Sequence, residues 1–121
     1  MNIPVIRSVE LLLDRAEINA LNGNTTEATK DINLIRDRAI PGYNINTVIA
    51  PEKILEEVQR ERLRELAFEG DRLHNLRRMM VDIGPGDRAA APIAWNSNQL
   101  LFRFPATEIK GSNGGVIQNP D

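Results

Sequence analysis

The longest helical pattern of the chain also carries its densest set of charged side chains. Glu61, Glu65 and Glu69 recur every four residues, and Arg62 and Arg72 lie close to them in the sequence. Residues three or four apart stand over one another on a helix, so the carboxylates share one face that the arginines reach. Paired carboxylates act as general acid and base in glycosidases. The same spacing also suits a solvated helix face or a packed ion-pair network, and both interpretations stay open at this point.

Other side chains that could do chemistry are scarce. The chain has no cysteine and one histidine, His74, so thiolate chemistry is excluded and a zinc site would need carboxylates for nearly every ligand. We therefore predict no catalytic residue, no metal and no cofactor, and a protein that is not an enzyme. Trp95 and Tyr43 are candidates for stacking on a ligand ring, although their more usual role is to anchor a core or a loop.

Composition limits the fold and the partners. With 121 residues and 41% hydrophobic content, the chain can bury one modest core, which predicts a single domain over residues 1–121. The net charge of -2 gives no general attraction to nucleic acid or to an anionic membrane. No apolar run approaches a membrane span, and the N-terminus lacks the pattern of an export signal. The sequence as it stands therefore predicts no targeting signal.

Hydrophobic periodicity predicts four helices. They cover residues 5–22, 25–39, 51–69 and 71–80. Asn24 is expected to cap the second helix in a capping box with Glu27, and Asp71 is expected to cap the fourth. The short connection at residues 23–24 makes the first two helices antiparallel.

The tail, residues 84–121, loses the helical period and is rich in Asn, Gly, Pro and Ala. We expect an extended strap laid over the helices, with a strand at 100–104 and one helical turn near Thr107. Four apolar residues are expected to anchor the strap, namely Trp95, Phe102, Phe104 and Ile109.

The first helix pair has the spacing of a tetratricopeptide repeat. Leu12, Ala16, Ala28, Ile32 and Pro41 fall near the positions where such repeats place apolar residues, small residues and a helix stop. The two alanines allow the helices to approach closely. Any tight helical hairpin needs small residues at its crossing, so the spacing fits this repeat without specifying it. The predicted fold is all-α, with antiparallel helix pairs of the tetratricopeptide-like type and an irregular C-terminal strap.

Four segments, in chain order, resemble the SusD/RagB family. The start, Ile3 to Arg7 followed by Glu10 to Leu13, resembles the family's PVIRLAEVLLIYAEA helix. Asn33, Arg36 and Arg38 fall within a match to LNxVRxRAG. The segment from Arg60 to Arg78 is similar to RERRxELxFEGxRxxDLRRW, and the end, with Phe104-Pro105 and Gln118-Asn119-Pro120, is similar to the terminal PIPxxEI and QNPGY patterns. This chain departs from the pattern at Leu73, Asn75 and Asp121.

The resemblance implies the C-terminal part of a longer outer-membrane lipoprotein. Such a parent protein captures glycans or other nutrients at the extracellular face of the outer membrane, beside a SusC-like TonB-dependent transporter. It implies no nucleic-acid partner, and a membrane association only through a lipid anchor that this chain does not carry. No ligand-contacting residue carries over to this chain from the family.

The resemblance favours the packed network at the charged helix. We therefore expect Glu61, Arg62, Glu65, Glu69 and Arg72 to form a structural ion-pair network, with the last three substantially buried. The alternative function is a free-standing helical module for protein–protein interaction. A glycoside hydrolase that uses Glu65 and Glu69 is a third hypothesis.

Overall fold

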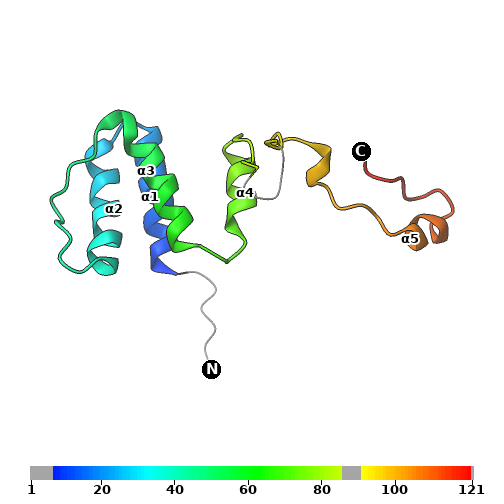
Figure 1. Ribbon diagram of the computed structural model, residues 1–121, viewed down its shortest axis with the longest axis horizontal. Coiled ribbons are helices and arrows are strands. Elements are labelled where there is room, and N and C mark those ends of the chain that lie inside the picture. The colour runs from blue at the N-terminus through cyan, green and yellow to red at the C-terminus, as the bar shows by residue number, and fades with distance from the viewer. Residues whose placement is uncertain (1–6, 86–90, 121) are drawn as a thin grey trace, which may run out of the picture. The chain divides into compact units, whose positions relative to one another are not determined.

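The computed structural model describes residues 7–85 and 91–120, and over these residues the chain is all-α, as predicted (Figure 1). The helices are α1 (Ser8–Leu21), α2 (Thr25–Ala39), α3 (Ile54–Glu65), α4 (Asp71–Arg78) and α5 (Ala106–Gly111). Two 3-10 turns cover Pro51–Lys53 and Asn98–Leu100. Strand-type pairing in the described part of the chain is limited to an isolated antiparallel bridge between Ile83 and Ile93. The chain divides into two compact units between Glu69 and Gly70.

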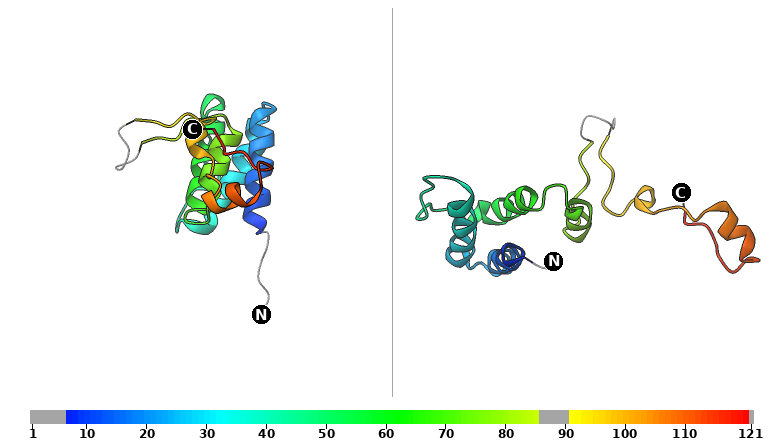
Figure 2. Two further views of the ribbon diagram at one scale, coloured as in Figure 1. Left: turned by 90° about the vertical axis from the view of Figure 1, so that its right-hand side faces the viewer. Right: turned by 90° about the horizontal axis from the view of Figure 1, so that it is seen from below.

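In the first unit, α1, α2 and α3 pack side by side around one core (Figures 1 and 2). Each helix supplies apolar residues three or four positions apart, which place one stripe per helix toward the centre. Leu13, Ile32, Ile35 and Val58 are the largest side chains that are fully buried. Ala16 and Ala28 are also fully buried, as the small-residue pattern of the first helix pair predicts. The core is completed by Val9, Ile49 and Ile54.

The turn between α1 and α2 is built by backbone hydrogen bonds. Gly23 has a left-handed backbone with φ of +76°. The N–H of Asn24 donates to the carbonyl of Asn19 at 2.8 Å, and that of Gly23 donates to Ala20 at 3.2 Å. This is the Schellman arrangement that ends helices at a glycine. The predicted side-chain cap at Asn24 is wrong: its amide lies 3.5 Å from the side chain of Asn19 and Glu27 pairs with Lys30 instead.

The third helix is shorter than predicted at both ends. Pro51 begins a 3-10 turn, and α3 itself runs from Ile54 only to Glu65. Residues 66–70 form a turn in which Phe68 and Gly70 both have left-handed backbones, with φ of +67° and +82°. Because an α-helix needs right-handed dihedrals throughout, the four-residue ladder of carboxylates stops at residue 65. Residues beyond that point no longer share a helix face with Glu61.

In the second unit, α4 begins at Asp71, so Gly70 occupies the cap position and the predicted capping role of Asp71 is wrong. α4 ends at Arg78, two residues before the predicted end. The helix α5 confirms the helical turn expected near Thr107.

The predicted strand at 100–104 does not form. Side-chain amides take the place of a neighbouring strand: Gln118 accepts from the N–H of Phe104 at 2.9 Å and donates to its carbonyl at 3.1 Å. Asn119 donates to the carbonyl of Phe102. Phe102 is 95% exposed, and its expected role as an anchor on the first unit stays a prediction. A strap over the first three helices stays a prediction, and residues 1–6, 86–90 and 121 lie outside the described part of the chain.

Among the described residues, no helix combines the length and the apolar character that a membrane span requires.

We predict that the buried alanines of the first unit leave no room for a larger side chain. Ala28→Leu inserts three carbons into a site with no exposed surface and should lower the free energy of unfolding by about 1 to 3 kcal/mol. Ala39→Leu, at the exposed end of the same helix, is the matched control and should change it by less than about 0.5 kcal/mol. Urea unfolding of both variants measures the difference. Equal effects from the two substitutions would contradict close packing at residue 28.

Candidate functional site

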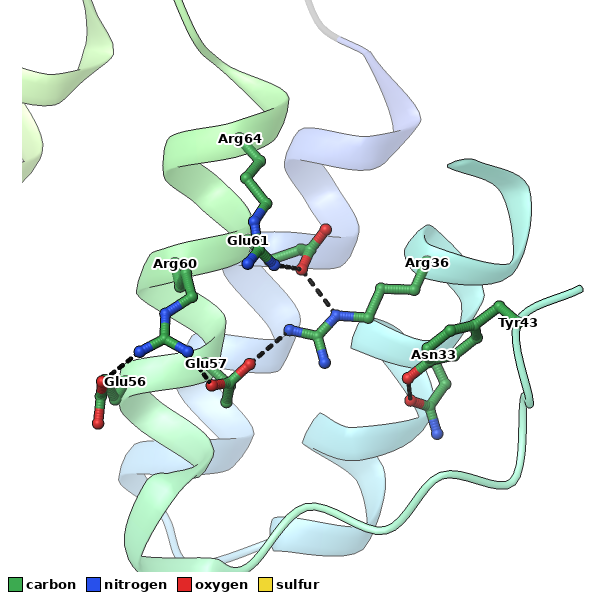
Figure 3. Close-up of polar contacts among 8 residues, drawn as sticks. All are labelled: Asn33, Arg36, Tyr43, Glu56, Glu57, Arg60, Glu61 and Arg64. Carbon is green, nitrogen blue, oxygen red and sulfur yellow. Dashed lines mark hydrogen bonds and ion pairs between the residues drawn. The ribbon is translucent and has the colours of Figure 1, made fainter. Parts of the chain in front are cut away.

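The main polar feature of the first unit is a set of ion pairs between α2 and α3, shown in Figure 3. Arg36 of α2 points toward α3, where its Nε donates to Glu61 at 2.8 Å and its Nη2 donates to Glu57 at 2.6 Å. The side chain of Arg36 is only 11% exposed, and that of Glu61 is 4% exposed. Because Glu57 and Glu61 are one helical turn apart, one guanidinium reaches both carboxylates.

Three further charges extend this set toward solvent. Arg64 donates to Glu61 at 3.1 Å, Arg60 donates to Glu57 at 2.7 Å, and Arg60 also donates to Glu56 at 2.6 Å. All of these come from α3, so they link successive turns of the same helix (Figure 3). We call the six residues, Arg36, Glu56, Glu57, Arg60, Glu61 and Arg64, the α2–α3 ion-pair cluster.

The cluster changes the protonation behaviour of its members. Burial alone acts to lower the pKa of Arg36, but hydrogen bonds to Glu57 and Glu61 outweigh burial and raise that pKa above its ordinary value. The hydrogen bond from Arg36 lowers the pKa of Glu57, against the smaller opposing effect of burial. Arg36 and Glu57 are therefore held in their charged forms, which suits a permanent ion pair and not a group that exchanges protons during catalysis.

Asn33 holds the loop that leads into α3. It lies one turn before Arg36 on α2 and is buried, and its Nδ2 donates to the carbonyls of Ile45 and Thr47 at 2.9 and 2.8 Å. Its Oδ1 accepts from the hydroxyl of Tyr43 at 2.7 Å (Figure 3). Both ends of the amide are thus satisfied by the same loop. Tyr43, a candidate for ligand stacking, is half-buried and takes part in fixing this loop.

The first helix is tied to its neighbours by another group of polar contacts. The carboxylate of Asp14 accepts from Arg62 of α3 at 2.7 Å. Glu17, buried in the interface, accepts from Gln59 at 3.0 Å. On the other side of α1, Arg15 makes a two-point contact with the buried carboxylate of Asp31 on α2. The three helices are thus joined pairwise by polar contacts around their apolar core.

The residues expected to form a single network have separate partners. Glu61 is buried and pairs with Arg36, while Arg62 pairs with Asp14. Glu65 is mostly buried and accepts from Arg38 at 2.7 Å. These partners lie on α1 and α2, and Glu61 also pairs along α3, with Arg64.

Glu69 is a correction to the expected burial. Glu69 is exposed and pairs at 2.8 Å with Arg7, whose Nη2 also lies 3.5 Å from the carbonyl of Glu65. Arg72 is exposed on α4. The physical reason is the end of α3 at residue 65: the turn that follows removes Glu69 from the helix face assumed in the prediction. Arg72 belongs to the second unit, and its pairing with residues of α3 stays a prediction.

Sequence reasoning missed the centre of the cluster, Arg36, and its second carboxylate, Glu57. Two arginines, Arg36 and Arg38, lie in the last turn of α2, and the next α-helix along the chain begins with glutamates in its first turn. The sequence thus contains the complementary charges, but it does not show which helix faces meet. Contacts between helices depend on which faces meet, and spacing along one helix does not give this.

The remaining candidates lie in the second unit. Trp95 is half-buried, and its backbone N–H donates to the carboxylate of Asp82 at 3.1 Å. His74 is exposed on α4. Among the residues that the structure describes, no group of three or more His, Cys, Asp or Glu side chains is arranged to hold a metal ion. Glu65 and Glu69, the pair considered for acid–base chemistry, each face an arginine.

Comparison with known proteins assigns the chain to a family. A family model described as the SusD family matches residues 1–120. The chain belongs to the SusD family. The SusD-like protein P2 of Formosa agariphila is 26% identical to it over 125 residues, which cover 95% of this chain and 25% of that protein. The chain thus spans about a quarter of the length of this relative, and no solved structure matches it.

Several residues of the motifs that resemble SusD proteins make the polar contacts that hold segments of the chain together. Arg7 comes from the first motif, Asn33, Arg36 and Arg38 from the second, and Glu61 from the third. In the last motif, the amides of residues 118 and 119 hold the backbone of residues 102–104. Asn75, where the family pattern has Asp, is buried and accepts from Arg78 at 2.6 Å. The neutral amide therefore still makes a hydrogen bond at this position.

We predict that Glu57 makes stability depend on acid pH. Its pKa is lowered below the ordinary value of 4.5 by folding, so the unfolded chain binds more protons in the interval between the two values. The contribution of Glu57 to the free energy of unfolding is complete above the ordinary pKa. It is lost as the pH falls through the lowered pKa of the folded state. Arg36, with a raised pKa, stays charged throughout this range.

Urea unfolding at a series of values between about pH 3 and pH 6 measures this loss. Glu57→Gln should flatten the dependence, because the substituted group cannot titrate. Glu56→Gln is the control at the adjacent position, where the side chain is 66% exposed, and should leave the dependence almost unchanged. A Glu57→Gln variant with the slope of the parent chain would contradict the assignment.

Proposed function

We propose that this chain is the C-terminal scaffold part of a SusD-like nutrient-binding lipoprotein of the outer membrane. The parent protein captures glycans at the extracellular face of the cell for import by a SusC-like TonB-dependent transporter. Family membership over residues 1–120 supports the proposal, as does the fact that the chain spans a quarter of the length of a SusD-like relative.

The scaffold role is supported by the contacts of the motif residues, which bind other parts of the same chain. Arg36 and Glu61 are largely buried against each other, and Asn33 uses its whole amide to fix a loop. Groups committed in this way are poor candidates for ligand contacts, since a ligand would have to replace bonds that hold the helices together. The chain therefore serves to position other parts of the protein, and it acts without catalysis.

The partners of the parent protein follow from the same proposal. The glycan and the transporter are engaged through the full-length protein, and the membrane is engaged only through a lipid anchor outside this chain. No cofactor and no nucleic acid takes part. A free-standing helical interaction module, the alternative, would instead engage a protein partner through the 121-residue chain alone.

Affinity electrophoresis tests the proposal with two samples, the product of the complete reading frame that encodes this chain and the 121-residue chain alone. Gels containing starch, xylan, laminarin or arabinan provide neutral probes. We expect the complete product to be retarded by at least one polysaccharide and to be recovered from outer-membrane extracts with a TonB-dependent transporter. The short chain should migrate as it does in a gel without polysaccharide.

Two outcomes would count against the proposal. Retardation of the short chain would place glycan contacts in the proposed scaffold. A complete product that is absent from the outer-membrane fraction and that co-purifies with a soluble protein would favour the interaction module.

A further inference from the structure

The chain contains two Asn-Gly dipeptides, Asn22-Gly23 and Asn113-Gly114, in different structural settings. Asparagine followed by glycine is chemically labile, because the backbone nitrogen of the glycine can attack the side-chain amide carbon. Glycine has no Cβ to hinder this approach. The reaction requires that the glycine N–H loses its proton to solvent, so a hydrogen bond at that N–H opposes it.

The first dipeptide is locked at the end of α1. The N–H groups of residues 22, 23 and 24 all donate to carbonyls of the last turns of α1, namely those of Ile18, Ala20 and Asn19. The attacking nitrogen, that of Gly23, is engaged at 3.2 Å. Reaction at Asn22 therefore requires the helix end to open first.

The second dipeptide forms the tip of a turn after α5. Asn113 and Gly114 both have left-handed backbones, with φ of +50° and +89°, and both are exposed. Positive φ at both central residues is the arrangement of a type I′ turn, which Asn-Gly favours. The turn is closed by the N–H of Gly115, which donates to the carbonyl of Ser112 at 2.9 Å. The N–H of Gly114 donates to no acceptor in the described part of the chain.

We propose that Asn113 is a site of spontaneous deamidation in the folded protein. The nitrogen of Gly114 attacks the side-chain carbon of Asn113, a bond forms between them, and the side-chain nitrogen leaves as ammonia. Water then opens the resulting succinimide at either carbonyl and gives aspartate or isoaspartate. No oxidant, reductant or enzyme is needed, and the product carries one additional negative charge.

The position of the site gives the reaction a structural consequence. Ser112 ties both sides of the turn, since its hydroxyl donates to Ile109 and accepts from the N–H of Val116. The chain then runs directly to Gln118, whose amide holds the backbone of Phe104. Isoaspartate inserts a methylene into the backbone at residue 113, so the turn loses the dihedrals that close it. The modification therefore weakens the contacts between Gln118 and the backbone of Phe104.

Peptide mapping by mass spectrometry tests the proposal on the intact chain, incubated at neutral to mildly alkaline pH. Each site reports in its own peptide through the mass gained when an amide becomes a carboxylate. In the folded chain we expect Asn113 to react at least about tenfold faster than Asn22, because only the latter needs local opening. In a parallel sample unfolded in urea, the two rates should approach each other.

Each alternative outcome has a definite meaning. Equal rates at the two sites of the folded chain, or a faster rate at Asn22, would overturn the proposal. An Asn113 peptide that stays unmodified in the folded chain while it reacts in urea would overturn it as well, since the turn would then be protective. An Asn113→Ala variant should lose the modified peptide and leave the rate at Asn22 unchanged.

Discussion

The largely buried guanidinium of Arg36 is the constraint on which the first unit depends. A charge removed from water is costly unless it is paired and hydrogen-bonded. Arg36 meets this condition only if Glu57 and Glu61 of α3 lie against the last turns of α2. The pairing therefore fixes the rotation of α3 about its own axis as well as its position. It also explains how a helix with so many charged residues can pack on an apolar hairpin.

The pairing of Arg36 also constrains the path of the loop before α3. For the two carboxylates to arrive at Arg36, residues 40–50 must follow one path, and Asn33 imposes that path through the carbonyls of Ile45 and Thr47. Ile49 then enters the core and Ile54 follows at the start of α3. Asn33 and Arg36 stand one turn apart on α2, so a single helix face controls both the loop and the next helix. Asn33 and Arg36, both from a motif that resembles SusD proteins, thus make the contacts that join α2 to the loop and to α3.

Local patterns in the sequence were sufficient for the first two helices of the first unit. The apolar spacing placed α2 at residues 25–39, and the buried alanines were visible from the repeat-like pattern. The end of α3 was not visible, because it depends on left-handed backbones at Phe68 and Gly70, and a phenylalanine gives no signal for that conformation. Glu69 was misplaced for this reason. The tail was misjudged because side-chain amides, which have no periodicity, replace a strand partner.

Arg36 and Glu61 stabilise the fold as a pair, and a double-mutant cycle measures the coupling energy between them. Arg36→Met, Glu61→Gln and the double variant would be compared with the parent chain by urea unfolding. Residues in one ion-pair network couple, and we expect the double variant to be more stable than the sum of the single effects by about 1.5 to 3 kcal/mol. Single effects that add to within about 0.5 kcal/mol would show that the two residues act independently, and would contradict the account.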